Sequence, residues 1–474
     1  MTQPDSSQRS LFQRLSDPMI LIFLILIVTY LLSLVVPAGQ FDRINVQVEG
    51  LTVAKVVPGS FAFIPDHPLI HPFQIFVAIP KGLLEAAPYL FIVFIAGALF
   101  HILQSTQALE ALIGVSVRKI GAHRRGLIIT VGTFIYGFFG VAVGFENNIA
   151  LIPVAALIAS AVGTSNLVGV CMAVGGIGVG FALSPINPYT VGTAQKIAGL
   201  APFSGAGFRT VMVLTALSLL SLYINWKVVP NALLGKETTS DQQSSDMTAL
   251  NMSEKLDQYH LTSRQISVLL VFLLGLIIMV YGALSLGWFI NEIGGLFIMM
   301  AIAIGLIYGF EADRLVEEMM KGASAVTSGA LIIGLAASIK VILDQAMMTD
   351  TIVEVLSGLI QGLPIALAAV VSSVVQGIIN LFVPSGSGQA MITMPILAPL
   401  ADLIGMEKQL MVTSFQVGDG LTNLIVPTSG GTLAMLALGK VSYGDWLKVI
   451  MPYMVIVYIL CWGFLVAGYF MGYS

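Results

Sequence analysis

Long apolar runs separated by short polar segments recur along the whole 474-residue chain. A helix needs about 20 mostly apolar residues to cross the ~30 Å hydrocarbon core of a bilayer. Runs of this kind predict membrane spans at residues 18–36, 84–103, 208–226, 266–283, 292–308, 323–343 and 449–470. The pattern predicts an all-α polytopic membrane protein, because within lipid only helices and closed barrels satisfy the polar groups of the backbone.

Two further apolar segments, 167–199 and 410–438, are interrupted by glycine, proline and hydroxyl residues. The interruptions are SPINPYTVGT in the first segment and VPTSGGT in the second, and Pro185 lies 242 positions before Pro427. The same offset relates Gly144 to Gly386, Pro153 to Pro395, Gly163 to Gly405, Gly176 to Gly418, Gly178 to Gly420 and Thr190 to Thr432. Interrupted spans at matching positions of two halves indicate the substrate site of a secondary transporter.

Each interrupted segment follows two short apolar arms that are joined by a polar tip. The arms at 127–163 flank Glu146-Asn147-Asn148, and the arms at 365–403 flank SGSGQ. Because the second arm of the first pair is too short to cross the bilayer, each pair is predicted to form a re-entrant hairpin. Irregular backbone at that depth must be buried in protein or line a cavity.

The distribution of basic residues gives the orientation, because Lys and Arg are concentrated in cytoplasmic loops. Arg9 and Arg14 place the N-terminus in the cytoplasm, and the equivalent residues Lys81 and Lys321 fall on opposite faces of the membrane. The two halves are therefore predicted to be inverted repeats. The predicted organisation is a cytoplasmic N-terminus (1–17), a first repeat (18–229), a polar cytoplasmic linker (230–264), a second repeat (265–448) and a last span (449–474).

A basic amphipathic segment, QALEALIGVSVRKIGAHRRG, follows the second span. Its apolar residues recur at helical spacing and its end is basic, which is typical of a helix that lies on the cytoplasmic membrane surface. A nucleic-acid interface is the alternative for such a cluster, but in a membrane protein the positive-inside rule accounts for it. We therefore expect the lipid bilayer, and not nucleic acid, as a partner.

The composition supports the membrane class and argues against several others. The chain is 57% hydrophobic and 10% charged with a mean hydropathy of +0.94, whereas soluble domains carry about 25% charged residues. Cys171 and Cys461 lie far apart in apolar runs, so neither a disulfide framework nor a metal cluster is expected. No HExxH motif and no GxSxG motif beside a plausible histidine occurs, so we expect no enzyme.

The two interruptions supply the groups that a carboxylate-bearing solute and a cation need. Half-helices that restart near Thr190 and Thr432 present free N–H groups and a positive dipole end to a carboxylate. The preceding half-helices end in free carbonyls, which suit Na⁺ when side-chain oxygens complete the shell. The predicted substrate-binding residues are Glu146, Asn147, Asn148, Ser184, Asn187, Thr190, Ser385, Ser387, Gln389, Thr428, Ser429 and Thr432.

Ionisable residues at membrane depth are functional candidates. Glu146 at the first tip and Asp419 in the second interrupted span are predicted, together with Asn423, to serve a coupling ion or proton. Either acid could also face a substrate ammonium group. Neither predicted site contains an arginine, and Arg209 is expected to lie outside both sites. This absence favours an amino acid over a dicarboxylate, because a second carboxylate needs a counter-charge.

Structural explanations compete with functional ones at several polar positions. The residues around each interruption could simply satisfy one another in a kinked helix. Lys340 and Asp344, four positions apart on one predicted helix, are expected to form an ion pair. His101 has no evident partner in the sequence and is expected to be hydrogen-bonded or to snorkel toward the membrane surface.

The stretches GFENNIALIPVAALIASAVG, LSPINPYTVGTAQKIAGL and GDGLTNLIVPTSGGTLAMLALGKVSYGDW resemble the YfcC family. This family is grouped with the anaerobic four-carbon dicarboxylate carriers (DcuC-like) in the ion transporter superfamily. The resemblance covers nearly the whole chain and implies a bacterial inner-membrane carrier with a dimeric scaffold and elevator-type mobile domains. It also implies either dicarboxylate transport or basic amino-acid exchange. The tips here differ from the Ser-Asn-Thr tips of the sodium-dicarboxylate relatives, so the sodium sites of those relatives do not carry over intact.

Together these features predict a secondary active transporter that moves a small carboxylate-bearing solute by alternating access. The solute is an amino acid or an organic acid such as a dicarboxylate, and coupling to Na⁺, coupling to H⁺ and exchange remain open. An ion or solute channel is the alternative class, although hairpins that enter from opposite sides place two gates around one site. No cofactor is expected besides a coupling ion, and the resemblance implies a homodimer.

Overall fold

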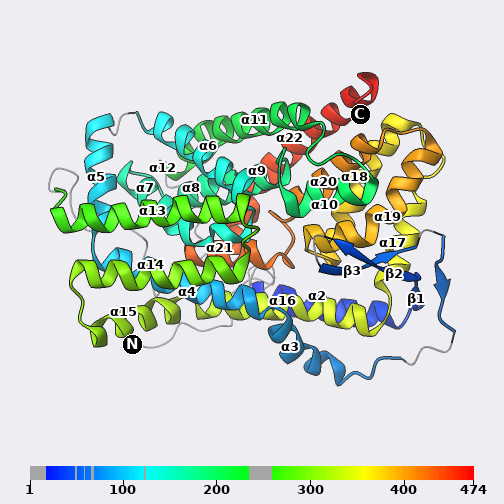
Figure 1. Cartoon of the computed structure of the whole chain (residues 1–474), viewed down its shortest axis with the longest axis horizontal. Coiled ribbons are helices and arrows are strands. Elements are labelled where there is room, and N and C mark those ends of the chain that lie inside the picture. The colour runs from blue at the N-terminus through cyan, green and yellow to red at the C-terminus, as the bar shows by residue number, and fades with distance from the viewer. Residues whose placement is uncertain are drawn as a thin grey trace.

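The computed structural model describes residues 18–48, 51–57, 59–65, 69–121, 124–233 and 259–473. Its secondary structure is almost entirely helical (Figure 1). Within the described residues, nine helices are long and apolar enough to cross a membrane. The chain is therefore a multi-pass membrane protein, as its hydropathy pattern predicts. The N-terminal segment 1–17 and most of the predicted linker 230–264 lie outside the described residues.

The helices of the first half begin and end close to the bounds that the apolar pattern predicts. They are α2 (Pro18–Ser33), α3 (Gln74–Glu85), α4 (Ala87–Ser105), α5 (Ala108–Ile120), α6 (Arg125–Val143), η3 (Glu146–Leu151), α7 (Ile152–Ala161), α8 (Asn166–Val170), η4 (Cys171–Gly175), α9 (Gly176–Ala182), η5 (Pro188–Gly192), α10 (Thr193–Ala198), α11 (Ala206–Tyr223), η6 (Ile224–Val228) and α12 (Val229–Leu233). The sequence pattern did not predict α3 as a separate helix. Its C-terminal residue is separated from α4 only by Ala86.

The second half contains fewer and longer helices. They are α13 (Ser263–Ser285), α14 (Ile290–Tyr308), α15 (Ala312–Ala325), α16 (Thr327–Gln345), α17 (Thr349–Gly358), α18 (Ile365–Phe382), α19 (Gly386–Ile404), α20 (Lys408–Thr422), α21 (Gly430–Leu438) and α22 (Tyr443–Phe470). Several begin at a side-chain cap: Thr262 and Gln265 form a capping box at α13, and Ser385 accepts an amide hydrogen bond at α19. Such caps satisfy amides that the first turn leaves without partners.

The second arms of the two hairpin segments end in the same way. Gly163 after α7 and Gly405 after α19 have φ angles of 74° and 73°, in the left-handed region that a side chain disfavours. The amide of the residue after each glycine donates to the carbonyl oxygen five residues earlier, at 2.9 and 2.8 Å. The two glycines are 242 positions apart, so this cap occurs twice at the offset found in the sequence.

The helices pack in two layers. Helices α2, α3, α4, α14, α15 and α16 contact one another and form the lower layer of Figure 1, with α13 along its upper edge. Helices α6 to α11 and α18 to α22 form the upper layer, where α6 packs on α9 and α18 on α20. The layers meet where α21 packs on α16 and where η3 packs on α4. Helix α5 crosses the ends of α4 and α13 at the left of Figure 1.

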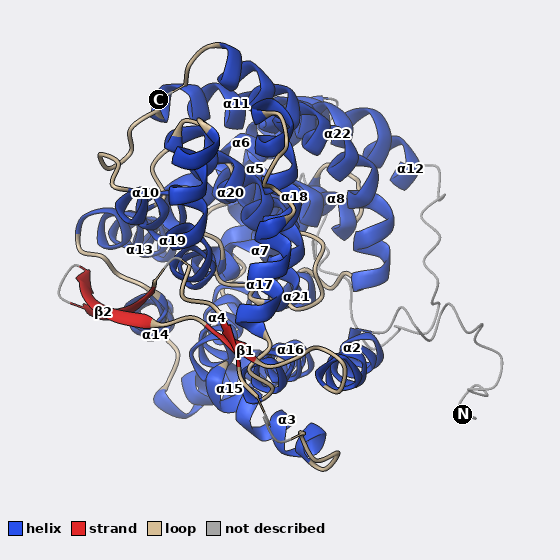
Figure 2. Cartoon of the chain, turned by 90° about the vertical axis from the view of Figure 1, so that its right-hand side faces the viewer, coloured by secondary structure: helices blue, strands red, loops and turns tan. Residues whose placement is uncertain are grey.

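Four short strands occupy the segment between α2 and α3. Strand β1 (Gly39–Gln40) pairs with β4 (Ala62–Phe63), and β2 (Arg43–Val48) pairs with β3 (Leu51–Val56), both antiparallel. These strands lie beside α17 and α19 (Figure 2). The guanidinium of Arg43 contacts the carboxylate of Asp350 on α17 at 2.8 Å, which ties the segment to the second half of the chain.

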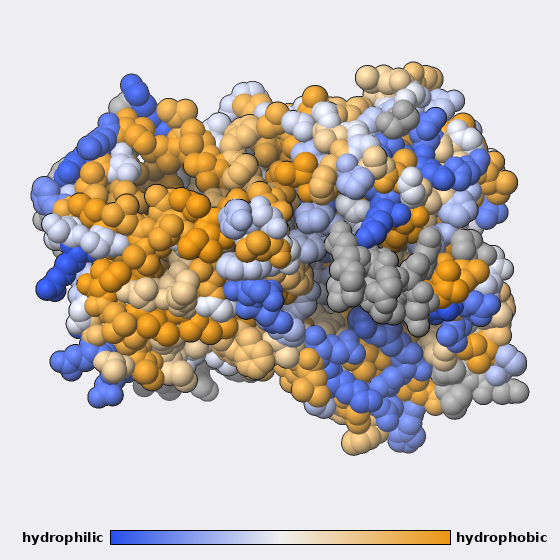
Figure 3. Space-filling model, in the orientation of Figure 1, coloured by the Kyte–Doolittle hydropathy of each residue, from blue (hydrophilic) through white to orange (hydrophobic). Residues whose placement is uncertain are grey.

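The outer surface has the polarity of a protein in lipid. Apolar side chains dominate the face formed by α13 and α14, and hydrophilic atoms gather at its left-hand end in the view of Figure 3. Lys340 pairs with Asp344 at 2.7 Å, as expected, and Nε2 of His101 lies 2.9 Å from a carboxylate oxygen of Glu318. The predicted pairing of Lys340 with Asp344 is therefore confirmed, whereas Glu318 is a partner of His101 that the sequence did not indicate.

Candidate functional site

The first interruption lies between α9 and η5. Helix α9 ends at Ala182 and the next helical turn begins at Pro188, so the backbone between them leaves helical geometry at Ser184 and Pro185. The carbonyl oxygen of Ser184 accepts a 2.7 Å hydrogen bond from Nε2 of Gln416 on α20. Asn187 caps the new turn, because its Oδ1 accepts the amides of Tyr189 and Thr190 at 2.8 and 3.2 Å.

The second interruption lies between α20 and α21. Its loop is held by side chains that donate to backbone carbonyls: Tyr443 to Ile425, Trp446 to Leu424 at 2.7 Å, and Thr432 to Asn423. Ser429 occupies the N-cap of α21 but makes no side-chain bond to the amides of the first turn. The amides of this first turn, which belong to the Gly430-Gly431 pair and Thr432, therefore lack the kind of side-chain cap that Asn187 gives to η5.

The two interrupted helices cross through a pair of glycines. A Cβ atom added to Gly178 on α9 would lie 2.3 Å from Cδ2 of Leu424, and one added to Gly420 on α20 would lie 2.4 Å from Cα of Ala182. Gly178 corresponds to Gly420, and Ala182 corresponds to Leu424, at the offset of 242. The two contacts are thus reciprocal, as they are at an interface with two-fold symmetry.

Each hairpin tip reaches the interruption of the other half. At the second tip, a Cβ on Gly386 would lie 2.4 Å from Cγ2 of Thr190 and 3.2 Å from Oδ2 of Asp419. At the first tip, Cγ of Glu146 would lie 2.8 Å from a Cβ on Gly431, at the start of α21. The fold therefore brings the two predicted tips and the two predicted interruptions together at one place.

Asp419 lies where the tips and interruptions meet, and the environment of its carboxylate is unusual. Its side chain is fully buried, and neither carboxylate oxygen has a hydrogen-bond partner among the described residues. The hydroxyl of Thr190, also buried, lacks a partner as well. Leaving a carboxylate buried without partners is costly, so such a group is expected to hold a proton or to receive a cation.

Asn380 on α18 is a functional candidate that sequence reasoning missed. It is fully buried, and its Nδ2 lies 2.9 Å from the carbonyl oxygen of Asp419, 2.8 Å from Oγ1 of Thr422 and 3.0 Å from Oδ1 of Asn423. Its own Oδ1 has no partner in the described structure. The available signal was the series of polar residues Ser372, Gln376 and Asn380, spaced four positions apart in a mostly apolar arm.

The other residues of the first tip are anchored to the arm that carries them. Asn147 is buried and donates to the carbonyl oxygen of Val143 at 2.9 Å, and Asn148 donates to that of Gly144 at 2.6 Å. The Oδ1 atoms of both amides are buried without a partner among the described groups. The tip therefore keeps two acceptors for a donor that the described chain does not supply.

Most of the remaining predicted site residues form hydrogen bonds with other groups of the protein. Ser184 donates to the carbonyl oxygen of Val141, Thr428 to that of Leu381, and Ser429 to Oγ1 of Thr432. Gln389 donates to Gln376, and its Oε1 has no partner within the described part of the chain. Ser385 serves as the N-cap of α19, and Ser387 is half-buried one residue beyond Gly386. Several hydroxyls therefore stabilise the interruptions themselves.

Arg209 does not lie where the sequence predicted. Its side chain is fully buried, and Nη2 donates to the carbonyl oxygens of Pro185 and Ser204 at 3.2 and 2.7 Å. Nη1 donates to the hydroxyl of Tyr473 at 3.0 Å, and Nε has no hydrogen-bond partner among the residues that the structure describes. The prediction that Arg209 lies outside the sites was wrong, because the turn at residues 199–205 folds α11 back against the first interruption.

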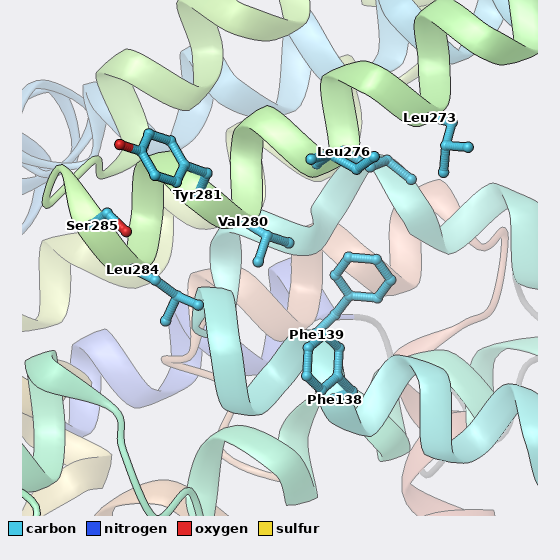
Figure 4. A pocket seen from close by; sticks show the side chains of 9 residues that line it. Phe138, Phe139, Leu273, Leu276, Val280, Tyr281, Leu284 and Ser285 are labelled. Atoms are coloured by element: carbon cyan, nitrogen blue, oxygen red, sulfur yellow. The ribbon is translucent and has the colours of Figure 1, made fainter.

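Other features of the described residues lie apart from this place. An apolar cavity of about 500 Å³ lies between α6 and α13, and none of the predicted site residues lines it (Figure 4). Its lining consists of Phe138 and Phe139 from α6 and seven residues between Leu273 and Ser285 from α13. In the described part of the chain, no group of three or more His, Cys, Asp and Glu side chains is arranged to hold a metal ion.

Comparisons with known proteins agree on a transporter. The DcuC family model, described as "C4-dicarboxylate anaerobic carrier", matches residues 15–470. A relative from Escherichia coli K12, named "Putative basic amino acid antiporter YfcC", is 30% identical and covers 96% of this chain and 97% of its own.

Among solved structures, the YdaH transporter of Alcanivorax borkumensis is 16% identical with a TM-score of 0.46, covering 96% of this chain and 99% of its own. MtrF of Neisseria gonorrhoeae, described as one of a class of antimetabolite efflux pumps, is 18% identical with a TM-score of 0.43, covering 96% of this chain and 95% of its own.

Proposed function

Because this chain belongs to the DcuC family of C4-dicarboxylate anaerobic carriers, and is therefore a membrane transporter and not an enzyme, we propose that it carries a basic amino acid by alternating access. The observation that carries the proposal is Asp419, a fully buried carboxylate without a hydrogen-bond partner in the described chain, beside the second hairpin tip. A buried group of this kind favours a cationic ligand.

The charges around the two interruptions complement those of a basic amino acid. Such a solute carries one carboxylate and two cationic groups. The uncapped amides at the start of α21 offer donors for the carboxylate, and Asp419 and Glu146 offer two acceptors for the cationic groups. The unpaired oxygens of Thr190, Asn147 and Asn148 supply neutral acceptors for additional N–H groups.

A dicarboxylate is the second candidate substrate. It is supported by the family, which is one of C4-dicarboxylate carriers, and by Arg209, whose buried guanidinium donates to the carbonyl oxygen of Pro185. In this alternative, the α21 amides hold one carboxylate and Arg209 supplies the positive field for the other. Asp419 and Glu146 are then left for coupling protons or for Na⁺.

We also propose that the two halves are inverted repeats and that the upper layer moves as an elevator against the lower one. Support comes from the reciprocal contacts of Gly178 and Gly420 and from the repeated glycine cap after α7 and α19. Gly176 and Gly418 likewise approach the carbonyl oxygens of Thr133 and Ser373, which lie 240 positions apart. Repeats of this kind give a transporter two exchangeable states around one site.

We further propose that the carrier lies in the bacterial inner membrane, with its N-terminus in the cytoplasm. It forms a homodimer that contacts lipid and its substrate. It needs no cofactor besides a coupling ion. Transport is proposed to run by exchange or with Na⁺ or H⁺, with Asp419, Glu146 and Asn423 near the coupling ion or proton. Asn423 lies beside Asp419 in this cluster, because its Nδ2 donates to the Asp419 carbonyl oxygen at 3.2 Å.

Charge movement in proteoliposomes tests the substrate, with arginine, ornithine, neutral amino acids and succinate each applied with and without Na⁺ and a pH gradient. We expect saturable currents with basic amino acids, and about a tenfold or greater loss of apparent affinity in Asp419→Asn and Glu146→Gln. Asp402→Asn, an exposed partner of Lys408, is the matched control and should behave as wild type. A response to succinate alone, unchanged in both site variants, would overturn the amino-acid proposal. Single-channel steps would instead revive the channel alternative.

A further inference from the structure

The cavity between α6 and α13 is lined by nine residues of these two helices. Its lining is almost wholly apolar, and its hydroxyl groups, those of Tyr281 and Ser285, lie together at one end (Figure 4). Leu273 lies at the other end of the α13 wall. The cavity therefore changes from polar to apolar along the axis of a single helix.

This direction matches the depth axis of a bilayer. Helix α13 is 23 residues long and is among the candidate membrane spans; Arg264 lies near its start and Glu292 soon after its end. Charged residues at both flanks place the ends of α13 near the membrane surfaces. Leu273 and Ser285 are separated by about 18 Å at 1.5 Å per residue, which is close to one leaflet of a ~30 Å hydrocarbon core.

We propose that this cavity binds one acyl chain of a membrane phospholipid, with the ester and headgroup region at Tyr281 and Ser285. Phe138 and Phe139 of α6 form the opposite wall, so the chain lies between the first arm of a hairpin segment and a helix at the edge of the lower layer. The hydroxyl end satisfies polar lipid atoms, and the apolar part excludes a polar solute.

The position of this site links the bound lipid to relative movement of helices α6 and α13. Helix α6 continues into the tip that carries Glu146, whereas α13 packs on α14. An acyl chain bound between α6 and α13 occupies the space between these helices. The size of that space changes when one helix shifts relative to the other. The lipid site does not rest on the substrate assignment, because it is defined by α6 and α13 alone.

A phospholipid with a photoreactive diazirine on one acyl chain tests the proposal in proteoliposomes, with labelled residues mapped by mass spectrometry. We expect labelling concentrated on Phe138, Phe139 and the α13 wall. Val280→Trp, whose larger side chain fills the cavity, should reduce this labelling about tenfold, because the acyl chain then loses contacts of its buried methylene groups. Leu274→Trp is the matched control, because Leu274 is 56% exposed on the same helix but does not line the cavity. Leu284→Trp repeats the filling test if Val280→Trp does not fold.

Two results would overturn the lipid site. One is labelling at Phe138 and Phe139 that is no greater than at Ile266, on the open face of α13, or that persists in both filled variants. The other is efficient disulfide cross-linking between two copies of an Ile277→Cys variant, which would make this face a contact between subunits. Melting temperatures of all variants in detergent establish that each one is folded.

Discussion

Nη2 of Arg209 donates a hydrogen bond to the carbonyl oxygen of Pro185 at 3.2 Å, so a buried guanidinium anchors the first interruption of the helical backbone. No carboxylate partner of Arg209 occurs among the described residues, and its positive charge is held by two carbonyl oxygens and a tyrosine hydroxyl. A buried charge of this kind contributes little to stability and is better explained by what it positions.

Replacing Arg209 with Met should therefore separate stability from function. We expect the melting temperature in detergent to stay near that of wild type, because an apolar side chain of similar size avoids the cost of burying a charge. Substrate affinity should fall about tenfold, since the Pro185 carbonyl loses its anchor. Arg125→Met, at an exposed position, is the control. A large fall in melting temperature that Arg209→Lys reverses would instead identify a structural role.

Gly386→Ala should disrupt the contact between the second hairpin tip and the first interruption. The new methyl group would lie 2.4 Å from Cγ2 of Thr190 and would push the tip away from Asp419. We expect at least about a tenfold loss of substrate affinity by isothermal titration. Thr190→Ser removes Cγ2, so the double variant should recover part of the loss.

Gly295→Ala is the control for this series, because a Cβ at that helical position meets no atom within 4 Å. A Gly386→Ala protein that binds substrate as tightly as wild type would show that this approach of tip and interruption is not required. The same conclusion would follow if Thr190→Ser gave no recovery.

The helix crossing gives a prediction about stability. Gly420→Ala places a methyl group 2.4 Å from the backbone Cα of Ala182, whereas the atoms nearest to the new methyl group in Gly178→Ala belong to the flexible side chain of Leu424. Overpacking costs about 1–3 kcal/mol where neighbours can adjust, so Gly420→Ala should lower the melting temperature more than Gly178→Ala. Leu424→Ala should rescue Gly178→Ala and leave Gly420→Ala impaired. Equal effects of both single variants would contradict this account of the crossing.

The ion pairs of α15 give a dependence on pH. Hydrogen bonding to Lys321 lowers the pKa of Glu318 below its ordinary value of 4.5. A lowered carboxyl pKa contributes stability that is present above the unfolded pKa and is lost as the pH falls through the folded one. Glu318→Gln should thus be less stable than wild type at pH 7, by less than about 1 kcal/mol because the pair is solvated.

Melting temperatures at pH 7 and near pH 4 check this sign. The difference between wild type and Glu318→Gln should shrink on acidification, while Glu354→Gln, exposed on α17, should show no such trend. A difference that stays constant or grows at low pH would contradict the Lys321 account and would point to His101, whose Nε2 lies 2.9 Å from the Glu318 carboxylate, as the dominant partner.

The sequence was informative where the signal is local. Proline and glycine fix backbone geometry within a few residues, so the interruptions at Pro185 and Pro427 and the polar tips could be found by inspection. Helix positions followed from the lengths of apolar runs. The pairing of Lys340 with Asp344 followed from helical spacing alone.

Contacts between distant segments could not be found in this way. Asn380 was missed because the polar series along its arm does not show which segment those side chains face. Its amide lies within hydrogen-bond distance of Asp419 and Thr422 of α20 and of Asn423, the residue that follows this helix. Arg209 was placed outside both sites because its distance from Pro185 depends on how the turn before α11 folds back.

By itself, the sequence determined the membrane class, the helical fold, the two interruptions and the family, because hydropathy and backbone restrictions act over one helix or less. Only the tertiary structure decided that the second tip lies against Thr190 and Asp419 and the first against Gly431. It also decided that Asp419 is buried without a hydrogen-bond partner in the described chain. These relationships arise from the packing of segments far apart in the chain, and such packing leaves no periodic trace in the sequence.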